Sequence, residues 1–88
     1  MVARLYAAGE LTAAERDRAW RFESLYRGAV LVGPWVPRGR VPGPEPRAKL
    51  RRALAVLGRD AGIVIDAAVF DRLDPGDLAR LRAALRRL

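Results

Sequence analysis

The side chains that could do chemistry in this chain of 88 residues are almost all cations. The sequence has 17 Lys and Arg against 10 Asp and Glu, and it has neither histidine nor cysteine. The usual zinc ligands, thiolate nucleophiles and histidine bases are therefore missing. Apart from two tyrosines, the hydroxyl side chains are Thr12 and Ser24, with no base to activate them. We expect a protein that is not an enzyme and that has no cofactor.

Five aspartates occur in one part of the chain, between residues 60 and 77. Their spacing differs from that of a calcium-binding loop. Several are explained as helix caps, because Asp is a favoured residue at the start of a helix. We therefore expect no metal site among them. The five are Asp60, Asp66, Asp71, Asp74 and Asp77.

The positive charge is concentrated in one block. Residues 38–59 hold seven cations against Glu45, whereas residues 60–77 hold Arg72 against the five aspartates. Clustered arginines attract phosphates, and each neutralised phosphate adds salt-dependent affinity for a nucleic acid. A solvated surface, with arginine stems covering apolar area, explains the same pattern. The residues predicted to contact nucleic acid are Arg38, Arg40, Arg47, Lys49, Arg51, Arg52, Arg80 and Arg87.

A long helix is predicted to precede the basic block. Thr12 and Glu15 form a capping box, in which the two side chains satisfy amides at a helix start. The helix should run from about 13 to 29, with one apolar face, and Gly9 should end a short turn before it. The apolar face consists of Ala19, Phe22, Leu25, Tyr26 and Ala29.

Trp20 does not belong to that apolar face. At about 100° per residue it falls on the polar side of the helix, close to Arg16 and Arg27. One possibility is that the following segment folds back and covers Trp20, with Trp35 packed against Trp20 or beside Phe22. The other is that Trp20 belongs to an exposed surface that stacks on a base or on a partner's side chain.

Prolines separate this helix from the rest of the chain. They exclude a helix or a central strand between 33 and 45, so an extended linker over 31–45 is expected. Pro46 can occupy the first position of the next helix, predicted over 46–58. We predict one small domain with an N-terminal unit (3–30), this linker and a C-terminal unit (46–88). The prolines are Pro34, Pro37, Pro42, Pro44 and Pro46.

The remaining segment should contain one or two helices. Residues 61–72 begin with β-branched residues typical of a strand, but no second strand is available for pairing, which favours a helix. Asp74 and Pro75 then begin a helix over 75–88. The two segments, joined by a turn at Leu73 and Asp74, have the proportions of a helix-turn-helix. The fold class is thus all-α, with three to four helices.

The last predicted helix carries a leucine stripe that must be buried. A chain of this size has little core, so part of the stripe should pack internally and part could dock on a protein partner or form a homodimer. The residues predicted to contact a partner are Trp20, Leu78, Leu81, Leu85 and Leu88.

The location is expected to be the cytoplasm. The longest apolar runs, such as 29–32 and 62–65, are far too short to span a bilayer, so no membrane is expected among the partners. No signal peptide is visible, and the absence of cysteine fits a reducing compartment.

Two stretches resemble a known group of proteins. Residues 5–12, with Glu15, Arg16 and the run from Phe22 to Tyr26, resemble the opening of small helical proteins from alphaproteobacteria and their prophages. The tail, 73–88, resembles their end, which looks like part of a helix-turn-helix of phage transcription regulators. The resemblance covers about half of the chain and implies a phage-like, DNA-associated setting without catalytic residues.

Two functions are therefore predicted as alternatives. The first is a small basic regulatory or packaging accessory protein that binds duplex DNA mainly through contacts between arginine and phosphate. The second is a helical module for protein–protein interaction that uses the leucine stripe or the Trp20 surface. Salt dependence separates them, because phosphate binding weakens steeply with salt and apolar docking does not.

Overall fold

The structure, a computed structural model, describes residues 1–30 and 44–88 and confirms the all-α class in these parts. Residues 31–43 of the linker predicted over 31–45, the site residues Arg38 and Arg40 and the predicted packing of Trp35 on Trp20 or beside Phe22 lie outside the described residues. The helices are α1 (Val2–Ala7), α2 (Ala13–Val30), α3 (Pro44–Leu57), α4 (Ala61–Ala68) and α5 (Leu78–Arg87), with single 3₁₀ turns at Gly58–Asp60 and Pro75–Asp77.

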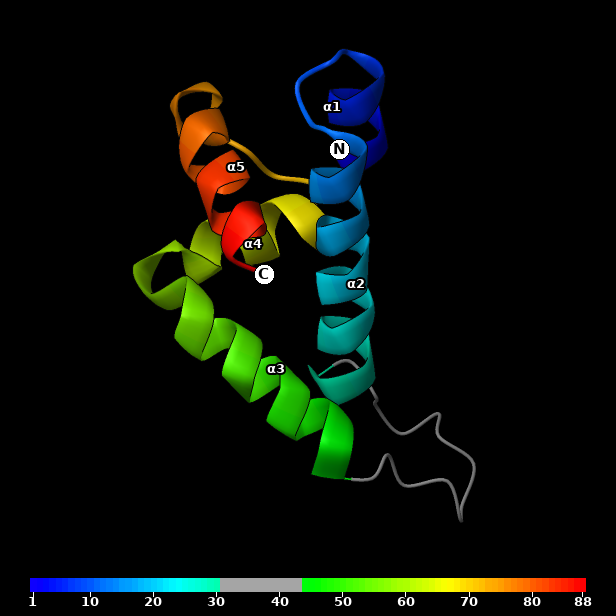
Figure 1. Cartoon of the computed structure of the whole chain (residues 1–88), viewed down its shortest axis with the longest axis vertical. Coiled ribbons are helices and arrows are strands. Elements are labelled where there is room, and N and C mark those ends of the chain that lie inside the picture. The colour runs from blue at the N-terminus through cyan, green and yellow to red at the C-terminus, as the bar shows by residue number, and fades with distance from the viewer. Residues whose placement is uncertain (31–43) are drawn as a thin grey trace.

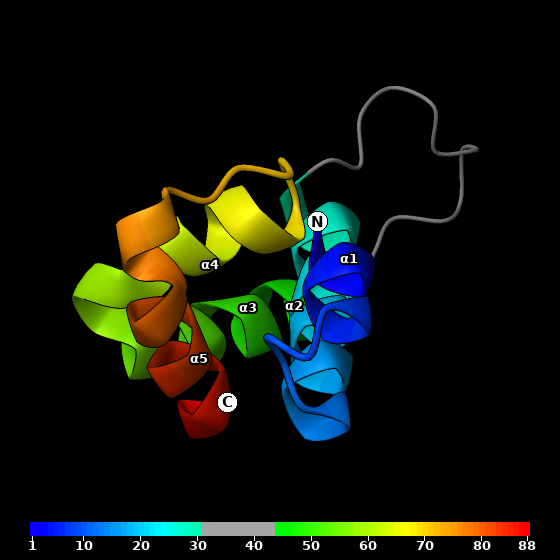
Figure 2. The same ribbon diagram turned by 90° about the horizontal axis from the view of Figure 1, so that it is seen from above.

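The helices are arranged around an open V formed by α2 and α3. The end of α2 lies beside the start of α3, and the two helices diverge from there (Figure 1). The pair α4 and α5 fills the open end, and α1 packs against the start of α2 (Figure 2). Helix α2 contacts all four other helices, so it is the central element of the fold.

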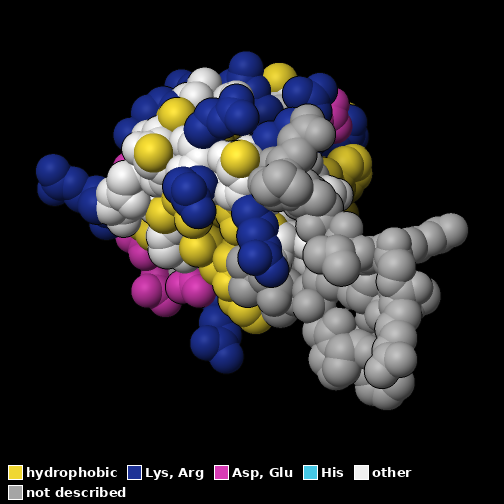
Figure 3. Space-filling view, turned by 90° about the horizontal axis from the view of Figure 1, so that it is seen from below, with side chains coloured by type: hydrophobic (Ala, Val, Ile, Leu, Met, Phe, Trp, Pro, Cys, Tyr) yellow, Lys and Arg dark blue, Asp and Glu magenta, His cyan; other side chains and the backbone are white. Residues whose placement is uncertain are grey.

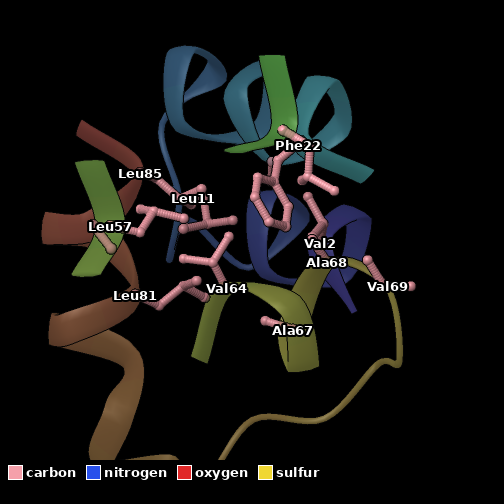
Figure 4. Packing of buried hydrophobic residues seen from close by; sticks show 13 residues of the cluster. Val2, Leu11, Phe22, Leu57, Val64, Ala67, Ala68, Val69, Leu81 and Leu85 are labelled. Carbon is pink, nitrogen blue, oxygen red and sulfur yellow. The ribbon is translucent and has the colours of Figure 1, made fainter. Parts of the chain in front are cut away.

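The core lies where α2, α4 and α5 meet. Phe22 from α2, Val64 from α4 and Leu85 from α5 are at most 1% exposed, and their side chains converge between the helices (Figure 4). Helix α3 contributes Leu57, and the turn before α2 contributes Leu11. Burial of side chains this large supplies most of the driving force for folding, at about 1.5–3 kcal/mol each.

Three predicted helix boundaries differ from the observed ones by two or more residues. The last helix, predicted from 75, begins as an α-helix at Leu78, after the 3₁₀ turn at Pro75–Asp77. Helix α3 begins at Pro44 rather than 46, because amides in the first turn have no partner within a helix and prolines are tolerated there. Helix α4 ends at Ala68 rather than 72: Asp71 takes a left-handed φ of 53°, and the Phe70 and Arg72 amides both donate to the carbonyl of Asp66.

This early end of α4 corrects the predicted helix-turn-helix. The connection to α5 runs from residue 69 to 77 and includes a 3₁₀ turn, instead of a two-residue turn at 73–74. Asp74 stands before that turn, and its carboxylate accepts no capping hydrogen bond from the backbone. The pair α4–α5 is therefore two packed helices with a longer connection than the motif predicts. None of the described helices has both the length and the apolarity to cross a membrane.

Two glycines end helices, and for Gly9 the sequence predicts this. Gly9 has φ of 77°, and the Gly9 and Glu10 amides donate to the carbonyls of Tyr6 and Leu5 in a Schellman motif. Gly58 has φ of 56° and ends α3. Gly62 lies inside α4, where its φ is not left-handed.

Gly58 and Gly62 form a matched pair for a stability test. Gly58→Ala places a Cβ in the left-handed region, so we expect it to lower the free energy of unfolding by about 1 kcal/mol. Gly62→Ala meets no atom within 4 Å and should raise that free energy by about 0.8 kcal/mol, because alanine is the better helix former. Thermal unfolding followed by circular dichroism should show a lower melting temperature for Gly58→Ala and a higher one for Gly62→Ala. Equal shifts of the same sign would contradict the assignment of Gly58 as the helix stop.

Candidate nucleic-acid interface

The arginines of α5 are held by two carboxylates. Asp60 accepts hydrogen bonds from Arg80 at 2.8 Å and from Arg87 at 2.6 Å. Arg87 also donates to the carbonyl of Leu57. The hydrogen bond from Arg80 lowers the pKa of Asp60, slight burial opposes it, and the charges of both arginines add to the lowering. Asp60 thus ties the end of α3 to α5 instead of capping α4, since its side chain makes no cap hydrogen bond.

These contacts change the predicted role of Arg80 and Arg87. Both were predicted to face a nucleic acid, and their guanidinium groups remain about half exposed. Both nevertheless form ion pairs with the single carboxylate of Asp60 within the fold. A phosphate would have to compete with a carboxylate for the same N–H groups, so these two arginines are poor candidates for the interface.

The second carboxylate, Glu15, is 2% exposed and holds the start of α2 against α5. It accepts from the Thr12 amide at 2.8 Å, and the Glu15 amide donates to the Thr12 hydroxyl at 3.1 Å, which confirms the predicted capping box. Arg82 and Arg86 lie 3.4 and 3.3 Å from its oxygens. Burial alone would raise the pKa of Glu15, but hydrogen bonds with Thr12 and the two arginines outweigh it, so the pKa is lowered.

The arginines of α3 and the turn after it are not paired in this way. From residue 47 to 59 the sequence contains no Asp or Glu. Four arginines in this run are exposed and make no hydrogen bond or ion pair with the described residues. Lys49 is also exposed but does make an interaction. The four are Arg47, Arg51, Arg52 and Arg59.

Hydrophobic side chains are interleaved with these cations. On the face shown in Figure 3, Lys and Arg side chains spread over the surface and exposed hydrophobic side chains lie between them. In α3, Val56 lies between Arg52 and Arg59 in the sequence, and 49% of its surface is exposed. Helix α3 thus combines exposed arginines, unpaired within the described residues, with exposed apolar surface, which is the composition of a binding surface rather than of a purely solvated one.

Two arginines of α2 were missed by the sequence analysis. Arg18 and Arg21 line the same pocket as Arg52, across from α3. Arg18 donates to the carbonyls of Leu85 at 3.3 Å and Arg86 at 2.9 Å, where it satisfies the open end of α5. Arg18 and Arg21 are three residues apart, which puts them on one side of α2. They were not predicted because α2 lies in a stretch where positive and negative charges nearly balance, and the prediction relied on blocks of like charge.

The leucine stripe of α5 faces inward. Leu81 and Leu85 are 1% and 0% exposed, so their prediction as partner contacts is wrong: they fill the core of the single chain. Leu78 and Leu88 are partly buried, and Leu88 packs against the same core. The internal burial also removes the main physical reason for expecting a homodimer.

Trp20 is 43% exposed and lies on the outer side of α2, as its position in the sequence predicts. The Arg16 guanidinium lies over the rings of both Tyr6 and Trp20, 4.2 and 4.9 Å from their centres. Asp17 accepts two hydrogen bonds from the same guanidinium. One face of the indole is thus used to join α1 to α2, which leaves less of it for a partner.

Comparison with known proteins gives no relative. No protein-family model, no curated protein and no solved structure matches the chain. The resemblance to prophage proteins therefore stays a prediction. In residues 1–30 and 44–88, no group of three or more Asp and Glu side chains is placed to hold a metal ion.

The lowered pKa of Glu15 predicts a specific dependence of stability on pH. The ionised carboxylate stabilises the fold, so its contribution is complete above the ordinary value of 4.5 and is lost as the pH falls through the lower pKa of the folded state. Glu15→Gln should cost about 1 kcal/mol at pH 7, or roughly 4–8 °C of melting temperature. The gap between the two proteins should shrink at acidic pH.

Glu10→Gln is the matched control for this measurement. Glu10 is exposed and forms no ion pair with the described residues, so its replacement should change melting by less than about 2 °C at any pH. A gap between Glu15→Gln and the native protein that stayed constant from pH 7 to acid would mean that packing, and not the charge, is what Glu15 contributes.

Proposed function

We propose that this protein binds duplex DNA through contacts between phosphates and the arginines of α3 and the following turn. The observation that carries the proposal is the division of the arginines. Those of α5 form ion pairs with Glu15 and Asp60, whereas Arg47, Arg51, Arg52 and Arg59 are exposed and form no ion pair with the described residues. A net charge of +7 adds long-range attraction to a polyanion.

The contact we propose is to the DNA backbone and not to particular bases. Base edges are read best by a mixture of Arg with Asn, Gln, Ser or Thr. Between residues 47 and 59 the other exposed side chains are Lys49, Ala55 and Val56, which carry no amide or hydroxyl group. Binding of this kind positions a protein on DNA without selecting a sequence.

Helix α3, rather than α5, is the element we place against DNA. The outer arginines of α5 are engaged with Asp60, and the long connection between α4 and α5 does not favour a helix-turn-helix docking mode. A biological role as a regulatory or packaging accessory protein is proposed from the resemblance of both ends of the chain to prophage proteins. A location in the cytoplasm is proposed from the short apolar runs of the sequence and its lack of cysteine.

The salt dependence of binding tests this proposal. Each phosphate contact contributes about 0.9 to the slope of log affinity against log salt concentration. Replacing Arg47, Arg51 and Arg59 together by Gln, which keeps the helix propensity, should lower the slope by about 2 to 3. Fluorescence anisotropy with a labelled duplex at several salt concentrations measures it.

The control variant replaces Arg4 and Arg72 by Gln. Both are exposed and make no ion pair with the described residues, but neither belongs to the α3 block. For this control, the slope of log affinity against log salt concentration should stay within about 1 of the native value. These residues contribute only to the long-range electrostatic field of the protein. If the control lowers the slope as much as the α3 variant, the net charge and not α3 is the source of binding.

A further inference from the structure

A small groove between α2 and α3 has features that DNA binding does not use. It has a volume of about 230 Å³ and lies in the V of these helices, beside the end of α5. Its floor is apolar. The residues of the floor are Phe22, Leu25, Ala53, Val56 and Leu88.

The groove is open to solvent at its apolar floor. Phe22 is 1% exposed and forms the bottom, whereas Leu25 and Leu88 are half-buried. Val56 is 49% exposed, and it is one of the few large hydrophobic residues exposed in the described chain. Such a surface gains stability when a further apolar group covers it.

The rim of the groove is entirely basic. Arg18, Arg21, Arg52 and Arg87 line it, and no Asp or Glu among the described residues does. Arg18 and Arg87 are held in place by backbone carbonyls of α5 and α3, and Arg87 also by Asp60. Arg21 and Arg52, on opposite sides, are exposed and unpaired within the described residues. Two fixed and two available guanidinium groups thus surround the apolar floor.

We propose that this groove docks an acidic amphipathic helix of a protein partner. One large apolar side chain of that helix would enter the groove against Val56 and Leu25, and flanking carboxylates would meet Arg21 and Arg52. The positive charge of the rim favours an acidic partner, and bidentate hydrogen bonds between arginine and carboxylate fix the orientation of that partner. A helix lying along two others presents its anchors at intervals of three or four residues, which suits the V of α2 and α3.

The size and lining of the groove disfavour other occupants. A volume of 230 Å³ is below the range of about 300–1,000 Å³ that is usual for small-molecule sites, but it suits one or two anchor side chains. The backbone of duplex DNA has charge but no protruding apolar group to cover Val56. This docking site is therefore distinct from the DNA contact of α3, and the two share Arg52.

Binding of a designed peptide tests the proposal. The probe is a fluorescein-labelled peptide of about four helical turns, with Leu at positions spaced by three and four residues and Glu at most others. Two control peptides replace Leu by Ser or Glu by Gln. We expect the first probe to bind at least about tenfold more tightly than either control, since both the anchor and the charge contribute.

Protein variants then locate the binding site. Val56→Asp should lower the affinity for the probe peptide by about tenfold, because it places a charge beside the apolar anchor. Arg21→Glu should lower it by a similar factor, because it repels the carboxylates of the peptide. Arg72→Glu, an exposed and unpaired arginine outside the groove, should change affinity by less than about threefold. Replacing Arg47, Arg51 and Arg59 by Gln should spare peptide binding, which separates this proposal from the one for DNA.

Three results would overturn the groove assignment. The first is equal affinity for the peptide whose leucines are replaced by serine, because attraction would then be electrostatic alone. The second is unchanged affinity of Val56→Asp. The third is an equal loss in Arg72→Glu and Arg21→Glu. The comparison of peptides uses the native protein throughout, so it decides the matter even if a variant fails to fold.

Discussion

The fold depends on the neutralisation of one buried carboxylate. Glu15 is almost completely inaccessible, and a charge in such a place is strongly unfavourable unless it is paired and hydrogen-bonded. Thr12 supplies the local partner, and Arg82 and Arg86 supply the distant ones. The start of α2 is therefore bound to α5, and the apolar faces of both helices meet in the core. Asp60 repeats the arrangement on the other side of α5, with Arg80 and Arg87.

This use of the carboxylates also decides where the protein is able to bind an anion. Glu15 and Asp60 are engaged with α5, so Arg47, Arg51 and Arg52 of α3 and Arg21 of α2 are left exposed and without an ion pair among the described residues. An unneutralised surface of this kind opposes the compact state through self-repulsion, and an anionic ligand relieves that repulsion. The pairing of Glu15 and Asp60 with α5 thus stabilises the fold and also leaves the arginines of the binding surface exposed.

Local signals in the sequence predicted the local structure well. The capping box of Thr12 and Glu15, the helix after it and the left-handed Gly9 were all predicted, because each depends on residues within a few positions. The pairing of Asp60 with Arg80 and Arg87 was not, since periodicity places a side chain on the outer face but does not say which neighbour it meets. The groove between α2 and α3 was missed for the same reason: its walls come from two helices whose packing geometry the pattern leaves open.

The link between α2 and α5 has a consequence for how the protein is made. Glu15 and Arg18 find partners 67 and more residues later in the chain, and Leu81 and Leu85 fill the centre of the core. During translation, α1, α2 and α3 emerge from the ribosome before α5 does. Their apolar faces stay uncovered until α5 emerges, and only then does the long loop close. This region therefore completes its folding only after α5 has emerged. Until then, the high charge of the nascent segment keeps it soluble.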